Sequence, residues 1–114
     1  MKKILWLSRH APLPVQVAEL KRLFGEVEIG RDVEPFQSAE RIAREYHKGD
    51  YDDMVIVAPL WVIAHLCAQG IKPLYADMEV VSVREQSHVE AAGRFYRFKR
   101  FRRIEAVEVK FSDL

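Results

Sequence analysis

The sequence is poor in the residues that build disulfides and cysteine-based metal sites. Its one cysteine, Cys67, cannot form a disulfide within the chain, and a zinc site built from cysteines is disfavoured for the same reason. No group of carboxylates and histidines has the spacing of metal ligands, so we expect no metal ion and no cofactor. The N-terminal apolar run, residues 4–7, is too short for a signal peptide or a membrane span. These absences predict a soluble, cytoplasmic protein that has no membrane partner.

Glycine-rich motifs are missing as well. The five glycines are isolated, so neither a dinucleotide-binding fingerprint nor a Walker phosphate loop can be built. A chain of 114 residues has the length of one domain, and we assign residues 1–114 to it. The formal net charge is only +1, but residues 94–103 hold six of the 18 basic side chains and no acidic one. The sequence therefore predicts a cationic patch on an otherwise acidic body.

The first two thirds of the chain alternate between strand and helix patterns. Continuous apolar runs at residues 4–7 and 54–58 are typical of strands that are buried on both faces of a parallel sheet. Helices are predicted from Pro14 to Gly25 and from the N-cap Ser38 to Gly49. Further elements are an edge strand at 27–29, a helix at 60–69 and a strand at 73–76. The helix at 60–69 is apolar almost all round, and we expect it to be heavily buried.

The last forty residues change character. Residues 80–83 are predicted to form another strand, and residues 85–93 a short helix or a loop. Two strand-like runs, 95–101 and 104–111, are expected to pair as an antiparallel hairpin with Arg102 and Arg103 at its bend. The fold class predicted is therefore α/β. It comprises a Rossmann-like, open, mostly parallel sheet flanked by helices, with a C-terminal basic β-hairpin.

Ser8, Arg9 and His10 are the strongest candidates for a functional site. In open α/β sheets, ligands bind beyond the carboxyl ends of the strands, and these residues follow the first strand directly. A hydroxyl, a fixed cation and a titratable imidazole then precede a helix N-terminus, which favours an anion. This pattern predicts phosphate recognition by Arg9 and the helix, with His10 or Ser8 at the reacting group. Alternatively, Arg9 is solvated and His10 caps a neighbouring element.

Other segments are expected at the same edge of the sheet and carry candidate ligand-binding residues. Pro59, Leu60 and Trp61 follow the strand at 54–58. Asp77 follows the strand at 73–76, and Arg84 follows the strand at 80–83.

The basic tract at residues 94–103 interleaves aromatic and cationic side chains. That composition is typical of a surface that binds phosphates and stacks bases, so RNA is a candidate partner. Alternatively, the aromatic rings enter the core while the cations stay in solvent. The cations of this patch are Arg94, Arg97, Lys99, Arg100, Arg102 and Arg103.

Residues 4–10, ILWLSRH, followed by Pro12, resemble the opening of the small stand-alone CRISPR-associated ring nucleases, which have CARF-like Rossmann folds. Residues 53–60, DMVIVAPL, are similar to a second block of that family. The resemblance implies a homodimer that binds a cyclic oligoadenylate across its two-fold axis and cleaves it without metal. The positions that match are Ser8, Arg9 and His10, whereas Leu60 and Trp61 depart from the family pattern.

Two other interpretations remain. The first strand of histidine phosphatases also ends in an Arg-His pair, but those enzymes need a second histidine after a late strand. Neither His65 nor His88 has the sequence context of that residue. A non-catalytic nucleotide-binding or RNA-binding module is the main alternative to a ring nuclease.

Overall fold

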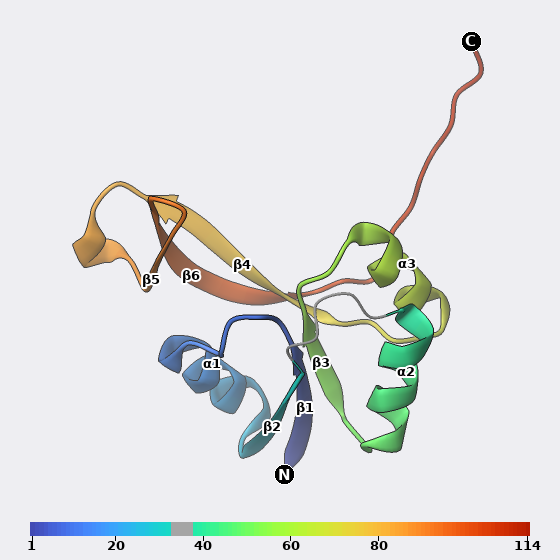
Figure 1. Ribbon diagram of the computed structural model, residues 1–114, viewed down its shortest axis with the longest axis horizontal. Helices are drawn as coiled ribbons and strands as arrows, with labels where there is room; N and C mark the ends of the chain where they lie inside the picture. Colours follow the sequence, from blue (N-terminus) through green and yellow to red (C-terminus); the bar gives the residue numbers. More distant parts are fainter. Residues whose placement is uncertain (33–37) are drawn as a thin grey trace.

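A computed structural model describes residues 1–32 and 38–114 (Figure 1). The described residues form one sheet of six strands, three α-helices and one short 3₁₀ turn. In chain order these elements are β1 (Lys2–Leu7), α1 (Pro14–Phe24), β2 (Val27–Asp32), α2 (Ala39–Lys48), β3 (Asp53–Ile56), α3 (Leu60–Ala68), β4 (Leu74–Val81), η1 (Arg84–Gln86), β5 (Val89–Ala91) and β6 (Arg94–Arg103). The α/β class predicted from the sequence is confirmed.

The sheet is mixed and has the strand order β2-β1-β3-β4-β6-β5. Strands β2, β1, β3 and β4 are parallel, whereas β6 runs antiparallel to both β4 and β5. Helix α1 covers one face, and helices α2 and α3 cover the other (Figure 1). Strand β1 is buried on both sides because Ile4 and Trp6 face α1 while Leu5 and Leu7 face α2 and α3.

The helix boundaries follow local signals that the sequence carries. Pro14 occupies the first position of α1, where its missing N–H costs no hydrogen bond. Gly25 ends α1 with a φ of 78°, a left-handed conformation that glycine adopts without steric cost. Ser38 caps α2, and its hydroxyl oxygen accepts a hydrogen bond from the Arg41 amide at 3.2 Å. These three predictions are confirmed.

Helix α3 is less buried than its composition predicts. Val62, Ile63 and Leu66 enter the core, but Leu60 is 71% exposed and Trp61 is 60% exposed. The helix therefore buries one side against the core and leaves Leu60 and Trp61 largely in solvent. No helix among the described residues is long and apolar enough to cross a membrane.

The C-terminal hairpin exists, but its strands differ from those predicted. It joins β5 to β6 through Ala92 and Gly93, both with positive φ, and Arg102 and Arg103 lie within strand β6 rather than at a bend. Residues 104–114 form no strand. The separate strands predicted at 73–76 and 80–83 are one continuous strand, β4. Pairing along β6 satisfies the backbone of β4 through residues 77–79, which lie between the two predicted strands.

A β-bulge places two aromatic rings of β6 on the same face of the sheet. Asp77 pairs with Arg100 and Met78 pairs with Phe98, which leaves Lys99 as the extra residue. The shift brings Phe98 and Phe101 together, with their ring centroids 4.9 Å apart; Phe98 is buried, and Phe101 packs against the core on the α1 face. Phe101 also meets the ring of Trp6 edge-on at 6.3 Å. The aromatic residues of the basic tract are therefore partly core residues.

An ion pair joins the end of β6 to the start of β3. The Arg103 guanidinium donates from Nη1 and Nη2 to the two carboxylate oxygens of Asp53, at 2.7 and 2.9 Å. Nη1 also donates to the carbonyl oxygen of Lys72 at 2.8 Å. The hydrogen bond with Asp53 is the main reason why the pKa of Arg103 is raised. Because β3 and β4 pair only at Val55 and Leu74, this contact is a principal connection between β6 and strand β3.

We predict that Asp53→Asn lowers the free energy of unfolding by about 1–2 kcal/mol, because one bidentate, partly solvent-screened charge pair is lost. Urea unfolding measures the change. Arg102→Lys is the control, since Arg102 is exposed on the same strand and forms no ion pair with the described residues. Its effect should stay within about 0.5 kcal/mol. Equal effects of the two substitutions would contradict the structural role of Asp53.

A second prediction concerns Tyr46, whose pKa is raised above 10.0 by burial and then by the carboxylates of Asp53 and Asp52. The folded protein holds the phenol proton more tightly than the unfolded chain does. Tyr46 therefore contributes its full stability below about pH 10, and this contribution is lost as the pH rises through the folded pKa. Urea unfolding between pH 9 and 11.5 should show a smaller alkaline loss for Tyr46→Phe than for the parent chain. Tyr75→Phe, at an exposed strand position, should retain the parent slope.

Candidate functional site

The strand order reverses between β1 and β3. The chain passes from β1 to β2 on one side and from β3 to β4 on the other, so the loops after β1 and β3 diverge over opposite faces. These loops begin side by side, because the Val57 amide donates to the Leu7 carbonyl oxygen at 2.9 Å. In α/β sheets such a position is where ligands bind. We call this side of the sheet the carboxyl edge and residues 8–10 the site loop.

Three hydrogen bonds fix the backbone of the site loop. The indole Nε1 of Trp6 donates to the His10 carbonyl oxygen at 2.8 Å, although the ring itself is buried in the core. The Ser8 hydroxyl oxygen accepts from the His10 amide at 3.2 Å. Arg31, on the neighbouring strand β2, donates from Nη2 to the Arg9 carbonyl oxygen at 3.4 Å. The loop is therefore positioned by the core and by β2 before any ligand arrives.

The side chains of the site loop face solvent. Arg9 and His10 are exposed and Ser8 is half-buried. The imidazole of His10 forms no hydrogen bond or ion pair with the residues that the structure describes, so either ring nitrogen is open to a ligand. Because the Ser8 oxygen accepts the His10 amide, the hydroxyl proton of Ser8 can be donated to an anion.

The N-terminus of α1 has fewer free backbone N–H groups for binding an anion than the sequence predicts. Pro14 has no N–H, and the amides of Gln16 and Val17 already donate to the Leu13 carbonyl oxygen at 2.9 and 3.0 Å. The recognition of an anion at this edge therefore depends on the side chains of the site loop.

The start of α3 forms the other side of the reversal point. Pro59 is the N-cap of the helix, and both Leu60 and Trp61 are largely exposed. The Trp61 ring meets His65 edge-on at 6.4 Å. His65 is itself exposed. The structure thus places the ligand-binding candidates Pro59, Leu60 and Trp61 at the carboxyl edge, as expected.

Two other candidates lie elsewhere. Asp77 is within strand β4, and its carboxylate forms an ion pair with Arg100 at 3.3 Å. Arg84 begins the 3₁₀ turn beyond the end of β4, pairs with Glu90 at 3.3 Å and lies over the ring of Phe95. Our expectation that Arg84 would reach the carboxyl edge is wrong. Strand β4 extends to Val81 and carries Arg84 to the outer end of the arm, which we define as β4, β5 and β6 (Figure 1).

Most cations of the basic patch are paired within the protein. Glu79 pairs with Arg97 and lies 3.8 Å from Lys99. Arg100 pairs with Asp77, and Arg103 pairs with Asp53. Arg94 and Arg102 form no ion pair with the described residues. Strand β4 thus supplies acidic side chains opposite the cations of β6, so the patch is much less cationic than the tract alone suggests.

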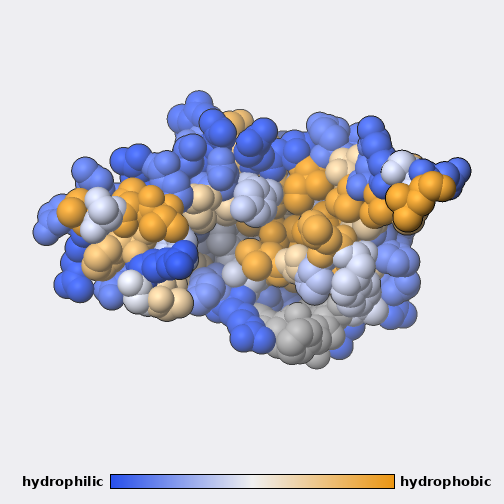
Figure 2. Space-filling view, turned by 90° about the horizontal axis from the view of Figure 1, so that it is seen from above, coloured by the Kyte–Doolittle hydropathy of each residue, from blue (hydrophilic) through white to orange (hydrophobic). Residues whose placement is uncertain are grey.

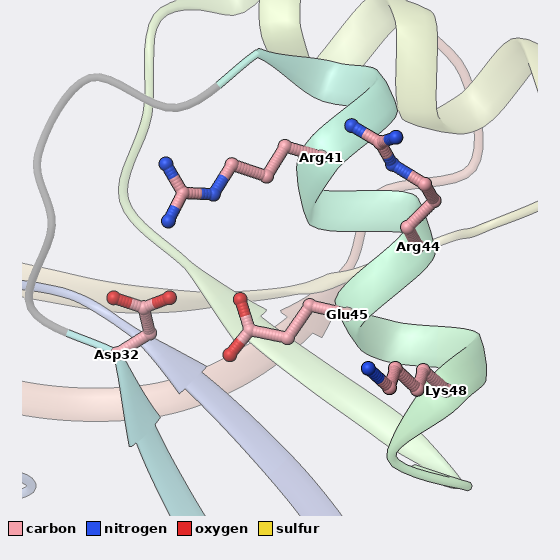
Figure 3. A pocket seen from close by; sticks show the side chains of 5 residues that line it. All are labelled: Asp32, Arg41, Arg44, Glu45 and Lys48. Atoms are coloured by element: carbon pink, nitrogen blue, oxygen red, sulfur yellow. The ribbon is translucent and has the colours of Figure 1, made fainter.

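A polar hollow of about 490 Å³ lies beside the carboxyl edge, between the end of β2 and helix α2 (Figure 3). Arg41 and Glu45 extend from α2 toward Asp32, the last residue of β2, which pairs with Leu7 of β1. This hollow was not predicted from the sequence. A usable signal was the spacing of polar residues on one face of α2. The lining residues are Asp32, Arg41, Arg44, Glu45 and Lys48.

The chemistry available at this edge is that of phosphate binding and proton transfer. The site loop supplies a guanidinium, an imidazole and a hydroxyl, and the adjoining hollow supplies further cations. Within the described part of the chain, no group of three or more His, Cys, Asp or Glu side chains could hold a metal ion. Comparisons with models of protein families, with curated proteins and with solved structures find no match.

We predict that Trp6→Phe loosens the site loop, because the His10 carbonyl loses its indole donor. Hydrogen exchange of the His10 amide should become about tenfold faster, in keeping with the loss of one partly buried hydrogen bond. Trp61→Phe is the matched control and should leave this exchange rate unchanged, since Trp61 is exposed and donates no hydrogen bond to the loop. Unchanged exchange in Trp6→Phe would show that the indole does not position the loop.

Proposed function

We propose that the protein binds a cyclic oligoadenylate at the carboxyl edge and cleaves it by a metal-independent reaction, as a ring nuclease. The observation that carries this proposal is the Ser8-Arg9-His10 loop at the strand-order reversal, held by the core with its side chains toward solvent. The order β2-β1-β3-β4 supports the Rossmann-like assignment. The resemblance of residues 4–10 to CRISPR-associated ring nucleases supplies the substrate class and implies a cytoplasmic role in antiviral signalling.

The reaction would be an in-line transesterification. A ribose 2′-oxygen attacks the adjacent phosphorus, the bond from phosphorus to the 5′-oxygen of the next nucleoside breaks, and a 2′,3′-cyclic phosphate and a 5′-hydroxyl result. His10 accepts the 2′-hydroxyl proton, and the leaving 5′-oxygen takes a proton from His10 or from water. Arg9 stabilises the charge that develops on the phosphorane oxygens. The Ser8 hydroxyl donates to a non-bridging oxygen, which orients the phosphate.

The surroundings of the site loop fit a ligand that carries several phosphates. Arg9 and the hollow lined by Arg41, Arg44 and Lys48 lie at the same side of the sheet, because Leu7 and Asp32 are paired at the ends of β1 and β2. A phosphodiester at Arg9 would leave an adjacent nucleotide within reach of this hollow. The carboxylates of Asp32 and Glu45 can accept hydrogen bonds from ribose hydroxyls.

A homodimer fits the same edge. Figure 2 looks onto this edge and shows apolar surface gathered over α3 and, separately, at the outer end of the arm. Val57, Leu60 and Trp61 account for the exposed apolar side chains near the start of α3. A two-fold arrangement would duplicate the site loop and enclose a ring-shaped ligand, which one chain of 114 residues leaves open.

The arm gives RNA binding less support. Four of its six cations are paired within the protein, so the surface offers fewer unpaired charges for phosphates than the tract suggests.

The ring nuclease proposal is tested directly by incubating the protein with labelled cyclic oligoadenylates in EDTA. Appearance of linear products with 2′,3′-cyclic phosphate ends supports it. Binding without cleavage would replace it with a nucleotide sensor, and binding only to linear RNA with steep salt dependence would replace it with an RNA-binding module.

The catalytic roles predict different effects at Arg9 and at unrelated arginines. Arg9→Ala should slow cleavage on the order of a hundredfold while weakening binding much less, because the charge it stabilises develops in the transition state. His10→Ala should slow cleavage and flatten its dependence on pH near neutrality. Single-turnover cleavage and separate binding measurements distinguish these effects.

Arg22→Ala and His47→Ala are matched controls, since both residues are exposed on helices outside the site. They should leave cleavage and binding unchanged. Normal cleavage by folded Arg9→Ala and His10→Ala would refute the catalytic assignment.

A further inference from the structure

Two segments far apart in the sequence carry matching patterns with opposite charges. Strand β2 contains Val27-Glu28-Ile29, and the C-terminal segment, residues 104–114, contains Val109-Lys110-Phe111. Each triplet has two apolar residues on one side of an extended chain and a charged residue on the other. If the two triplets pair with their apolar residues on the same face, Glu28 faces Lys110 in either strand direction.

Strand β2 has an open edge for such a partner. It is the first strand of the sheet, and no described residue pairs with its outer side. Val27 and Ile29 are only half-buried against the core on the α1 face, next to Phe24. An added strand would satisfy the outer backbone groups of β2 and extend this apolar face.

The C-terminal segment has the form of a donor strand. Ile104 and Val107 anchor it against the core on the α2 and α3 face. Beyond them the chain extends away from the body, past the carboxyl edge (Figure 1). Val109 is 75% exposed and Phe111 is 92% exposed, which leaves two large apolar side chains in solvent.

The segment and the β2 edge of one molecule are badly placed for each other. The anchor at Val107 lies on the α2 and α3 face, whereas Val27 and Ile29 face α1 at the margin of the sheet. The residues that follow Val107 also leave the body on the side of α3, away from β2 (Figure 1). A second molecule that faces the carboxyl edge has no such restriction.

We propose that residues 108–113 of one chain add to strand β2 of a second copy, and that the exchange is reciprocal. A parallel pairing places Val109 beside Val27, Phe111 beside Ile29 and Lys110 opposite Glu28. It is favoured over the antiparallel pairing because it alone brings Asp113 opposite Arg31, whose guanidinium holds the Arg9 carbonyl oxygen of the site loop. Two equivalent exchanges close a two-fold dimer. The proposal does not depend on the nuclease activity.

Sedimentation velocity of the full chain across micromolar concentrations tests the exchange. Phe111→Glu should abolish or strongly weaken the dimer. Val80→Glu is the control, since Val80 is 57% exposed on the arm, and it should have no effect. A monomeric parent chain, or a dimer that Phe111→Glu leaves unchanged, overturns the proposal.

A charge exchange tests the pairing itself. Glu28→Lys and Lys110→Glu should each weaken dimerisation about tenfold, because each dimer contains the pair twice. The double variant should recover most of the lost affinity, and hydrogen exchange of the β2 amides should slow again on dimerisation. Failure of the double variant to recover overturns the assigned pairing. Cleavage assays are not needed for this test, so its failure and that of the proposed function are separable.

Discussion

The bidentate ion pair between Arg103 and Asp53 connects the arm to strand β3 of the parallel part of the sheet. Strand β4 pairs with β3 at one position, Leu74 with Val55, and then continues with β6 beyond the parallel strands. Arg103 returns from β6 to the start of β3 and also binds the Lys72 carbonyl oxygen. The position of the arm relative to the carboxyl edge depends on this contact, together with the packing of Phe101 against Trp6.

The same arrangement decides how the charges of the basic tract are used. Cross-strand pairing places Asp77 and Glu79 opposite cations of β6, so these charges stabilise the arm. The bulge at Lys99 separates the aromatic side chains of the tract from these cations, because it turns Phe98 and Phe101 inward. A tract that resembles a nucleic-acid surface in sequence is therefore mainly a structural strand.

Trp6 links the core to the candidate site. Its ring packs with the α1-side core and with Phe101, while its indole N–H holds the His10 carbonyl oxygen. The contacts that place the arm and those that position the site loop thus converge on one side chain. Preorganisation of this kind favours a site in which phosphate recognition and proton transfer need little rearrangement. The hollow on α2 lies beside the same edge, because Asp32 at the end of β2 pairs with Leu7 at the end of β1.

The sequence by itself determined the elements whose signals are local. Pro14, Gly25 and Ser38 bound helices through backbone geometry and capping, and the apolar run of β1 predicts a buried strand whatever its neighbours are. It also predicted that residues 8–10 lie at the carboxyl edge, because that position follows from strand polarity. Only the tertiary structure decided the partners of β6, the length of β4 and the place of Arg84. Each of these depends on long-range pairing, in which a strand satisfies its backbone groups and charges with residues that local patterns cannot identify.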